Sequence, residues 1–262
     1  MTTHFFTTDD GVKLAYRTVG TGPEQLIMLH GFNCTSHNFD WMLPFFAPDR
    51  YTIVLPDLRG GGESEKPDTG YTLERFGRDL LALIRELGWQ QFSLVGHSTG
   101  GAIAQWVAAE AEVPLRTLIL LGPVPATGVP MPPEGAAMFR AAAESAEGRA
   151  AVWQMGWSTP IPADLLDVLV SDSMTWRREA MLEMFEAWSN ANFPERLAHI
   201  RVPTLVVGAQ HEPFLTADFL HAKVVSQISG ARFVEVPNSN HYMHIEQPAF
   251  TAGVVIGFLA AH

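Results

Sequence analysis

The chain has 262 residues, of which 17 are basic and 28 are acidic, and its formal net charge is −11. Nucleic acids and anionic membranes are bound chiefly through clusters of Lys and Arg, and the longest basic run here is the pair Arg177-Arg178, so we expect neither as a partner. With 47% apolar and 17% charged residues, the composition excludes a disordered chain and predicts a large hydrophobic core.

Targeting and membrane-spanning signals are not evident in the sequence. Residues 1–10 lack the basic and apolar regions of a secretory signal, and the apolar stretch at 250–261 is shorter than the roughly 20 residues needed to cross a bilayer. The single cysteine, Cys34, cannot form an internal disulfide and fits a reducing compartment. We therefore expect a cytoplasmic protein.

Short apolar runs bounded by turn residues predict β-strands from the start of the chain onward. They span residues 12–19, 25–29, 51–55, 92–95, 117–121, 204–207 and 232–236. Several consist of Leu, Ile and Val without alternation, which is typical of strands buried on both faces of a parallel sheet. The clearest helix spans residues 72–87 and ends at Gly88, and further helices are expected after Ser98, Thr216 and Ile245. This alternation predicts an α/β fold with a mostly parallel sheet and helices on both faces.

The alternation is interrupted between residues 122 and 203, where no convincing strand appears. This segment begins with a proline-rich stretch and continues with helix-like sequence rich in Trp and Met. We therefore expect residues 1–122 and 203–262 to form the core domain and residues 123–202 to form an inserted helical lid, or cap. Core packing accounts for most of its large apolar side chains, and the rest could line an apolar pocket. The candidate substrate-binding residues are Asn33, Trp153, Trp157, Trp176 and Met184.

The strongest chemical signal is a G-x-S-x-G sequence, Gly96-His97-Ser98-Thr99-Gly100, between a predicted strand and a predicted helix. In this context the two glycines allow a tight turn that exposes Ser98 at the carboxyl edge of the sheet. The amino end of the following helix favours developing negative charge. Ser98 is therefore the candidate nucleophile.

A serine nucleophile needs a base, and the base needs a group that orients it. Among ten histidines, His241 is favoured because it follows the predicted strand at 232–236 and precedes the last helix. The acid should follow a strand and precede the histidine in the chain, which selects Glu212. Asp218 is the rival, but it falls in the first turn of a helix that Thr216 can cap. The alternative acid position, after the strand that ends at Leu121, offers no carboxylate.

The loop His30-Gly31-Phe32-Asn33 follows the strand at 25–29, where this architecture donates one amide to an oxyanion hole. The backbone N–H groups of Phe32 and Thr99 are the candidate donors. Each such donor is typically worth ~3 kcal/mol of transition-state stabilisation.

Taken together, these motifs resemble the α/β-hydrolase family over essentially the whole chain. The resemblance is carried by His30-Gly31, Pro56-Asp57-Leu58-Arg59-Gly60, the segment from Gly96 to Gly101, and Asn240-His241 followed by Glu246-Gln247-Pro248. Within that family, Glu212-Pro213-Phe214 followed by Asp218-Phe219 resembles the metal-free N-acyl-homoserine lactonases, whose acid is a glutamate at the matching position. The sequence departs from those lactonases at Phe32-Asn33-Cys34, His97 and Thr99. The resemblance implies the fold and the catalytic triad and leaves the substrate open.

The same residues exclude several other chemistries. Dehalogenases and epoxide hydrolases of this fold attack with an aspartate, and Ser98 occupies that position. The sequence contains neither the histidine-rich cluster of a zinc lactonase nor a glycine signature for phosphate or dinucleotide binding, so we expect no metal and no cofactor.

We expect a serine hydrolase that cleaves a small, largely apolar carboxylic ester or lactone through an acyl-enzyme. A histidine acts as a base only in its neutral form, so activity should fall in acid. The sequence leaves open a C–C bond hydrolase, a cofactor-free oxygenase, and a receptor-like binding protein with slow turnover. It also leaves a homodimer open.

Overall fold

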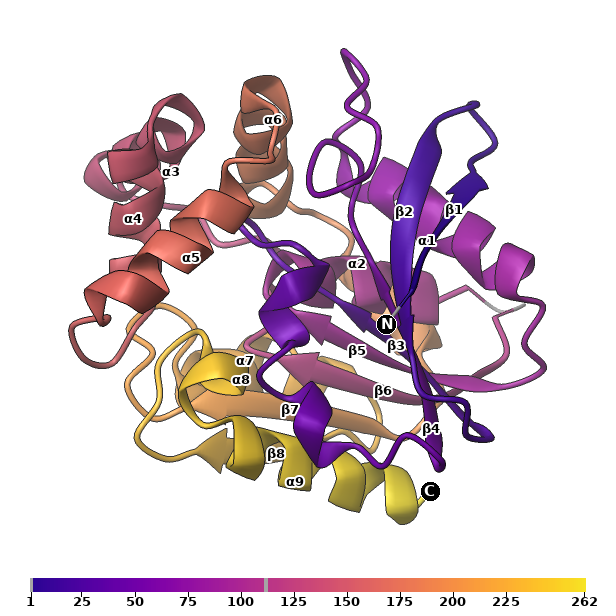
Figure 1. Ribbon diagram of the computed structural model, residues 1–262. Coiled ribbons are helices and arrows are strands. Elements are labelled where there is room, and N and C mark those ends of the chain that lie inside the picture. Colours follow the sequence, from indigo (N-terminus) through magenta and orange to yellow (C-terminus); the bar gives the residue numbers. More distant parts are fainter. Residues whose placement is uncertain (1, 111–112) are drawn as a thin grey trace.

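The computed structural model describes residues 2–110 and 113–262, which contain an eight-stranded sheet (Figure 1). The strands are β1 (Thr2–Thr7), β2 (Lys13–Val19), β3 (Glu24–Leu29), β4 (Tyr51–Pro56), β5 (Phe92–His97), β6 (Leu115–Leu121), β7 (Thr204–Ala209) and β8 (Arg232–Val236). Their order in the sheet is β1-β2-β4-β3-β5-β6-β7-β8. The pairs β1/β2 and β2/β4 are antiparallel, and the strands from β4 to β8 are parallel to one another. The predicted α/β architecture is confirmed.

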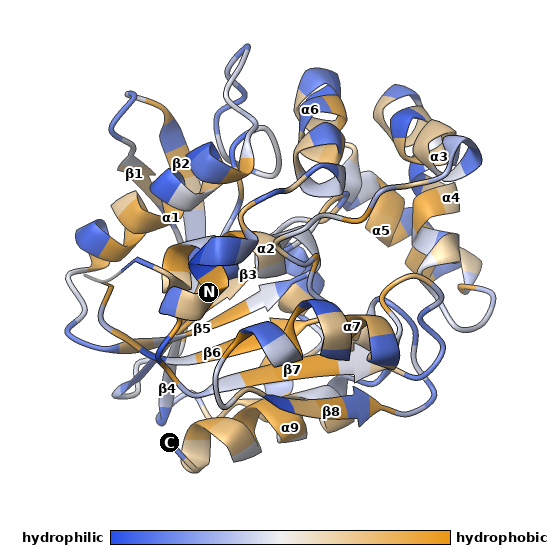
Figure 2. Cartoon of the chain, turned by 180° about the vertical axis from the view of Figure 1, so that it is seen from behind, coloured by the Kyte–Doolittle hydropathy of each residue, from blue (hydrophilic) through white to orange (hydrophobic). Residues whose placement is uncertain are grey.

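Helices cover both faces of the sheet, and the sheet separates two apolar cores. One face packs against α1 (Leu73–Leu87), α2 (Thr99–Ala108) and α7 (Ala217–Lys223). The other packs against α9 (Pro248–Ala260) and the 3-10 helices η1 (Ser36–Phe39) and η2 (Leu43–Phe45). Along β5, Leu94 belongs to the first core and Val95 to the second, as expected for a strand buried on both faces. Figure 2 shows the same apolar character along β6 and β7.

The predicted helix at 72–87 illustrates how local sequence signals set an element's ends. The Thr72 side chain accepts a hydrogen bond from the Arg75 N–H and caps α1 at its start. Gly88 ends the helix with a φ of 61°, a left-handed conformation that glycine adopts without strain. The strand at 232–236 was also predicted with its observed bounds.

Strand β1 was not predicted, because most of its side chains are exposed and its sequence lacks an apolar run. It is held by antiparallel pairing with β2, which is visible only in the folded chain. Edge strands of this kind carry a weak hydrophobic signal.

Four α-helices lie between β6 and β7 in the chain, and they stand over one end of the sheet (Figure 1). They are α3 (Pro133–Glu144), α4 (Ala146–Met155), α5 (Ala163–Ser173) and α6 (Arg178–Ser189), and we refer to them as the helical insertion. The remaining short helices are η3 (Pro194–His199), η4 (Val225–Gln227) and α8 (Met243–Glu246). Within the described part of the chain, no helix has the length and apolar character needed to cross a membrane.

The end of α5 and its connection to α6 are tied to the core by hydrogen bonds. The Thr35 hydroxyl donates to the Asp172 carboxylate at 2.6 Å, and the Trp176 indole N–H donates to the Cys34 carbonyl at 2.7 Å. On the core side, the donor Thr35 and the acceptor Cys34 both belong to the loop after β3. The helical insertion is therefore anchored beside the loop that carries Phe32.

Candidate active site

Ser98 lies at a strained turn between β5 and α2. Its φ of 54° and ψ of −118° place a non-glycine residue in a sparsely populated conformation, which costs on the order of 1–3 kcal/mol. The flanking glycines make the turn feasible, because a Cβ at Gly100 would collide with the carbonyl oxygens of Leu29 and His30. The Ser98 residue is 8% exposed. The expected elbow is thus present, and it holds the serine at the carboxyl end of β5.

Glu212 and His241 form a hydrogen-bonded pair, and both line the same cavity as Ser98. The Nδ1 atom of His241 lies 2.7 Å from Oε2 of Glu212, and Oε1 of Glu212 accepts the backbone N–H of Phe214 at 3.0 Å. Glu212 follows β7, and His241 lies between β8 and α8, so parallel strands bring both to the edge of the sheet where Ser98 lies. Because Nδ1 is engaged by the carboxylate, Nε2 is the ring nitrogen left for a proton from the serine.

The electrostatics of this pair keep the carboxylate ionised. Burial raises the pKa of Glu212, which is 7% exposed, but the His241 ring and the backbone amides of Phe214 and Leu215 lower it more, and the resulting pKa lies below its ordinary value. An ionised Glu212 stabilises the imidazolium that forms when His241 takes a proton.

The two rival acid positions are also resolved by the structure. Thr216 caps α7 by accepting the Phe219 N–H, and Asp218 lies in the first turn of that helix, as expected for a residue that offsets the helix dipole. Gly122, after β6, faces His241, since a Cβ there would lie 3.7 Å from Nδ1. This second position is close enough for an acid but carries no side chain.

The loop after β3 runs directly against the serine. A Cβ at Gly31 would lie 2.7 Å from the Ser98 Cβ, so only glycine allows this approach. Thr99 is the first residue of α2, and the N–H groups of a helix's first turn have no intrahelical acceptor. Among the described residues, none accepts a hydrogen bond from the N–H of Phe32 or Thr99. Both amides are thus available near Ser98.

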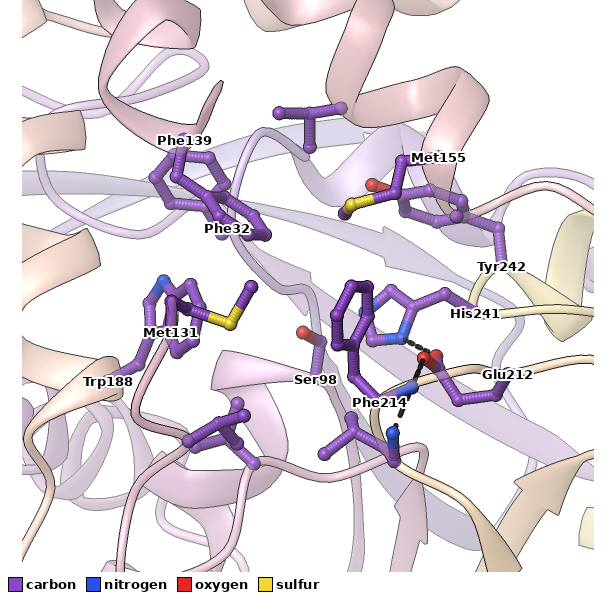
Figure 3. Close-up of a pocket in the computed structure, with 15 residues that line it drawn as sticks. Phe32, Ser98, Met131, Phe139, Met155, Trp188, Glu212, Phe214, His241 and Tyr242 are labelled. Atoms are coloured by element: carbon purple, nitrogen blue, oxygen red, sulfur yellow. Dashed lines mark hydrogen bonds and ion pairs between the residues drawn. The ribbon is translucent and has the colours of Figure 1, made fainter. Parts of the chain in front are cut away.

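A cavity of about 60 Å³ lies in front of Ser98, and Figure 3 shows the serine hydroxyl facing it. The core contributes Phe32, Ser98, Glu212, Phe214, Leu215, His241 and Tyr242 to its lining, and the segment from Val124 to Trp188 contributes Val124, Val129, Met131, Phe139, Val152, Met155, Gly156 and Trp188. Most of these side chains are apolar. The cavity therefore suits an apolar group attached to a reacting carbonyl.

The side chains offered as substrate-binding candidates lie outside this cavity lining. Trp153 is fully buried and packs on Tyr242 with ring centroids 4.2 Å apart. Trp157 also contacts Tyr242, with ring centroids 6.2 Å apart, and borders a separate surface groove. Met184 is buried in the core. None of these three residues lines the cavity in front of Ser98.

The other two candidates serve the contact between the helical insertion and the core. Trp176 donates its indole N–H to the Cys34 carbonyl, as described above. Asn33, with a φ of 61°, donates its side-chain amide to the carbonyl of Arg149 on α4 at 3.3 Å. Trp176 and Asn33 thus each form a hydrogen bond between the helical insertion and the core.

The lining residues missed by sequence reasoning carry no motif of their own. Phe139, Val152 and Trp188 come from three helices of the insertion, and which face of each helix turns inward depends on packing. Tyr242 is the exception, since its position directly after His241 could have placed it at the site. Met131 comes from the proline-rich segment before α3, whose path the sequence does not define.

Two fully buried histidines lie behind His241. The Nε2 atom of His97 lies 3.0 Å from the carbonyl oxygen of His241, so this nitrogen carries the proton and donates. Burial, with the nearby His244 and His241 rings, holds the pKa of His97 well below its ordinary value. Burial likewise lowers the pKa of His244 to about 3. Both rings are neutral at physiological pH. His97 directly precedes Ser98, so its hydrogen bond joins the turn that holds the serine to the backbone of His241.

Among the described residues, no group of three or more His, Cys, Asp or Glu side chains is arranged to hold a metal ion. The histidines near the site form ring contacts instead, with the centroids of His97 and His244 4.3 Å apart.

Comparisons with known proteins agree with this architecture. A model of the alpha/beta hydrolase family matches residues 26–254. The chain is 27% identical over 256 residues to a non-heme haloperoxidase of Rhodococcus erythropolis, covering 91% of this chain and 93% of that protein. An esterase from Exiguobacterium antarcticum superposes with a TM-score of 0.87 at 20% identity, covering 98% of each chain. Est816, described as an N-acyl homoserine lactone degrading enzyme, superposes with a TM-score of 0.80 at 24% identity, covering 96% of this chain and 99% of its own. The chain belongs to the alpha/beta hydrolase family.

Proposed function

We propose that the protein is a serine hydrolase that cleaves small carboxylic esters or lactones through an acyl-enzyme. Ser98 Oγ attacks the carbonyl carbon while His241 Nε2 takes the hydroxyl proton, and the oxyanion accepts hydrogen bonds from the N–H groups of Phe32 and Thr99. Collapse breaks the ester bond, and the leaving oxygen takes the proton from His241. Water then attacks the acyl group with His241 again as base, which releases the acid and restores Ser98.

The observation that carries this proposal is the meeting of three groups at one apolar cavity. A strained serine, a histidine and an ionised glutamate come from three separate strand ends, and the histidine is oriented by a 2.7 Å contact. A strained backbone at a serine without a chemical role would cost stability for no gain. The α/β-hydrolase membership supports the same reading.

The cavity size supports a short acyl group. One ordered water requires about 10–15 Å³ of cavity volume measured with a water-sized sphere, so a cavity of about 60 Å³ holds a few atoms rather than a long chain. We assign residues 123–202 the role of a lid that sets this size, with residues 1–122 and 203–262 as the catalytic core. The similarity to Est816, described as an N-acyl homoserine lactone degrading enzyme, favours a lactone. The cavity volume favours an acyl group of a few carbons, whether the substrate is an ester or a lactone.

Intact-protein mass spectrometry tests the proposal. The wild type is mixed with p-nitrophenyl acetate and, separately, with N-butanoyl homoserine lactone, and compared with Ser98→Ala and with Ser226→Ala, which removes an exposed hydroxyl far from the cavity. We expect an acetyl adduct in the wild type and in Ser226→Ala, and neither adduct nor turnover in Ser98→Ala.

The outcomes separate the alternatives that share this fold. Opening of the lactone by the wild type would select the lactonase reading, and turnover of the ester alone would select a carboxylesterase. No adduct and no turnover with either compound would contradict the proposal and favour a binding protein. Oxygen consumption with an apolar substrate would instead favour the cofactor-free oxygenase.

A further inference from the structure

Tyr242 places a polar atom in a cavity whose other walls are largely apolar. The residue is 2% exposed and lines the cavity. Figure 3 shows its hydroxyl directed inward, beside Met155 and toward the Phe32 side of the cavity. Among the described residues, none forms a hydrogen bond with this hydroxyl. A ligand oxygen that accepts a hydrogen bond from this hydroxyl would therefore gain affinity.

The ring of Tyr242 is held in place from several sides. Trp153 packs on one face, and the edge of the ring meets His241 with centroids 5.3 Å apart and planes at 82°. Gly156 makes room for it, because a Cβ there would lie 2.6 Å from the Tyr242 Cε2 atom. The hydroxyl is therefore positioned before a substrate enters, which limits the entropy lost on binding.

The hydroxyl acts as a hydrogen-bond donor at physiological pH. Burial raises the pKa of Tyr242 well above its ordinary value, and the nearby Cys34 and Glu212 raise it further. The phenol thus stays protonated under conditions where the enzyme would work.

The other polar atoms of the lining have roles or are sealed. Glu212 and His241 bind each other, and Ser98 faces the reacting carbonyl. The indole nitrogen of Trp188 also lacks a hydrogen-bond partner, but it is buried from solvent, and its ring packs T-shaped on Phe139 with centroids 5.0 Å apart. Among the polar side chains that line the cavity, Tyr242 thus carries a hydroxyl that the proposed reaction does not use.

We propose that Tyr242 is a specificity-determining residue that donates a hydrogen bond to a second acceptor oxygen of the substrate. The substrate class is an ester or lactone that carries a carbonyl or ether oxygen besides the reacting carboxyl group. This inference rests on the proposed function, since it concerns the same cavity. A site built to bind an acceptor discriminates against the hydrocarbon analogue, because the donor is then left unpaired.

The test uses two pairs of esters that differ by one atom. Methyl methoxyacetate and methyl butanoate differ in the acyl chain, and 2-methoxyethyl acetate and butyl acetate differ in the leaving alcohol. The measured quantity is the ratio of kcat/KM for the ether over the hydrocarbon, which is compared between the wild type and Tyr242→Phe. We expect this ratio to fall about tenfold in Tyr242→Phe for at least one pair, because the variant loses only the hydroxyl.

Tyr51→Phe is the matched control. The Tyr51 hydroxyl is also buried without a hydrogen-bond partner, but it lies at the start of β4, outside the cavity lining. Its ratios should equal those of the wild type. Ratios in Tyr242→Phe that equal the wild type for both pairs would overturn the inference. Absence of turnover of all four esters by the wild type would overturn the proposed function itself, and this inference with it.

A second measurement does not depend on the folding of Tyr242→Phe. Calorimetry with Ser98→Ala, which retains Tyr242, compares binding of each ether with its hydrocarbon partner. We expect the ether of at least one pair to bind more tightly although it is the less apolar compound. Tighter binding of the hydrocarbon in both pairs would contradict a hydrogen bond from Tyr242.

Discussion

The two sides of the cavity differ in how their residues are held. On the core side, Ser98, Glu212 and His241 lie at strand ends and are held by a strained turn, a Glu212–His241 hydrogen bond and backbone amides. On the side of the helical insertion, Phe139, Val152 and other apolar side chains are placed only by packing. We therefore expect substitutions at Ser98, Glu212 or His241 to remove the reaction, and substitutions in the cavity wall of the insertion to change the acyl chain that is accepted.

Removal of the nucleophile should have the largest effect on the core side. Ser98→Ala deletes the atom that forms the acyl-enzyme, so we expect kcat for p-nitrophenyl acetate to fall roughly 10⁵-fold while substrate binding persists. Steady-state kinetics with a fresh preparation, free of wild-type enzyme, measures this. Residual activity within tenfold of the wild type would show that another group performs the chemistry.

Removal of the charge on the acid should come next. Glu212→Gln retains the size of the side chain but no longer stabilises an imidazolium, and a comparable change in a serine protease triad lowers kcat about 10⁴-fold, so we expect a loss of roughly 10³- to 10⁴-fold. Asp218→Asn, which removes a nearby carboxylate at the start of α7, is the control and should remain within about twofold. Equal losses in the two variants would contradict the choice of Glu212.

Glu212 should also make stability depend on pH in acid. Its pKa in the folded protein is below the ordinary value of 4.5, so the folded state holds the proton less tightly than the unfolded state. The stabilisation from this group is therefore complete above pH 4.5 and is lost as the pH falls through the folded pKa. Urea unfolding between pH 6 and pH 3 should show a smaller loss of stability in Glu212→Gln than in the wild type. A larger loss in the variant would contradict a lowered pKa of Glu212 in the folded protein.

The core side was largely predictable from sequence, and the reasons are local. Ser98 lies in a short motif between recognisable elements, and Glu212 and His241 each follow an apolar strand, so chain order and strand ends were sufficient to select them. Strand β1 was missed because its stability comes from pairing with β2. The candidates Trp153 on α4 and Met184 on α6 do not line the cavity, because residue type alone does not reveal which face of an insertion helix turns inward.

His97 tests whether the core side depends on its support. Its ring donates to the His241 carbonyl, so His97→Leu should shift the base and lower kcat about 10- to 30-fold with little change in KM, in line with the cost of small misplacements at reacting groups. His97→Gln keeps an N–H donor and should recover part of kcat. Equal activity in both variants and the wild type would show that the bond does not position His241, and a parallel loss of thermal stability would indicate a structural role.

The insertion side should change selectivity without removing the chemistry. Val152→Ala deletes two methyl groups from the cavity wall, so esters with an acyl group one or two carbons longer should gain about tenfold in kcat/KM relative to the acetate. Val168→Ala makes the same deletion on α5, where the side chain is 57% exposed and lies outside the cavity lining, and should leave the chain-length profile unchanged. Kinetics over a series from acetate to octanoate compares the two. A uniform fall of kcat for all esters in Val152→Ala would mean that the insertion takes part in the chemistry, because a change confined to pocket size must depend on the length of the acyl group.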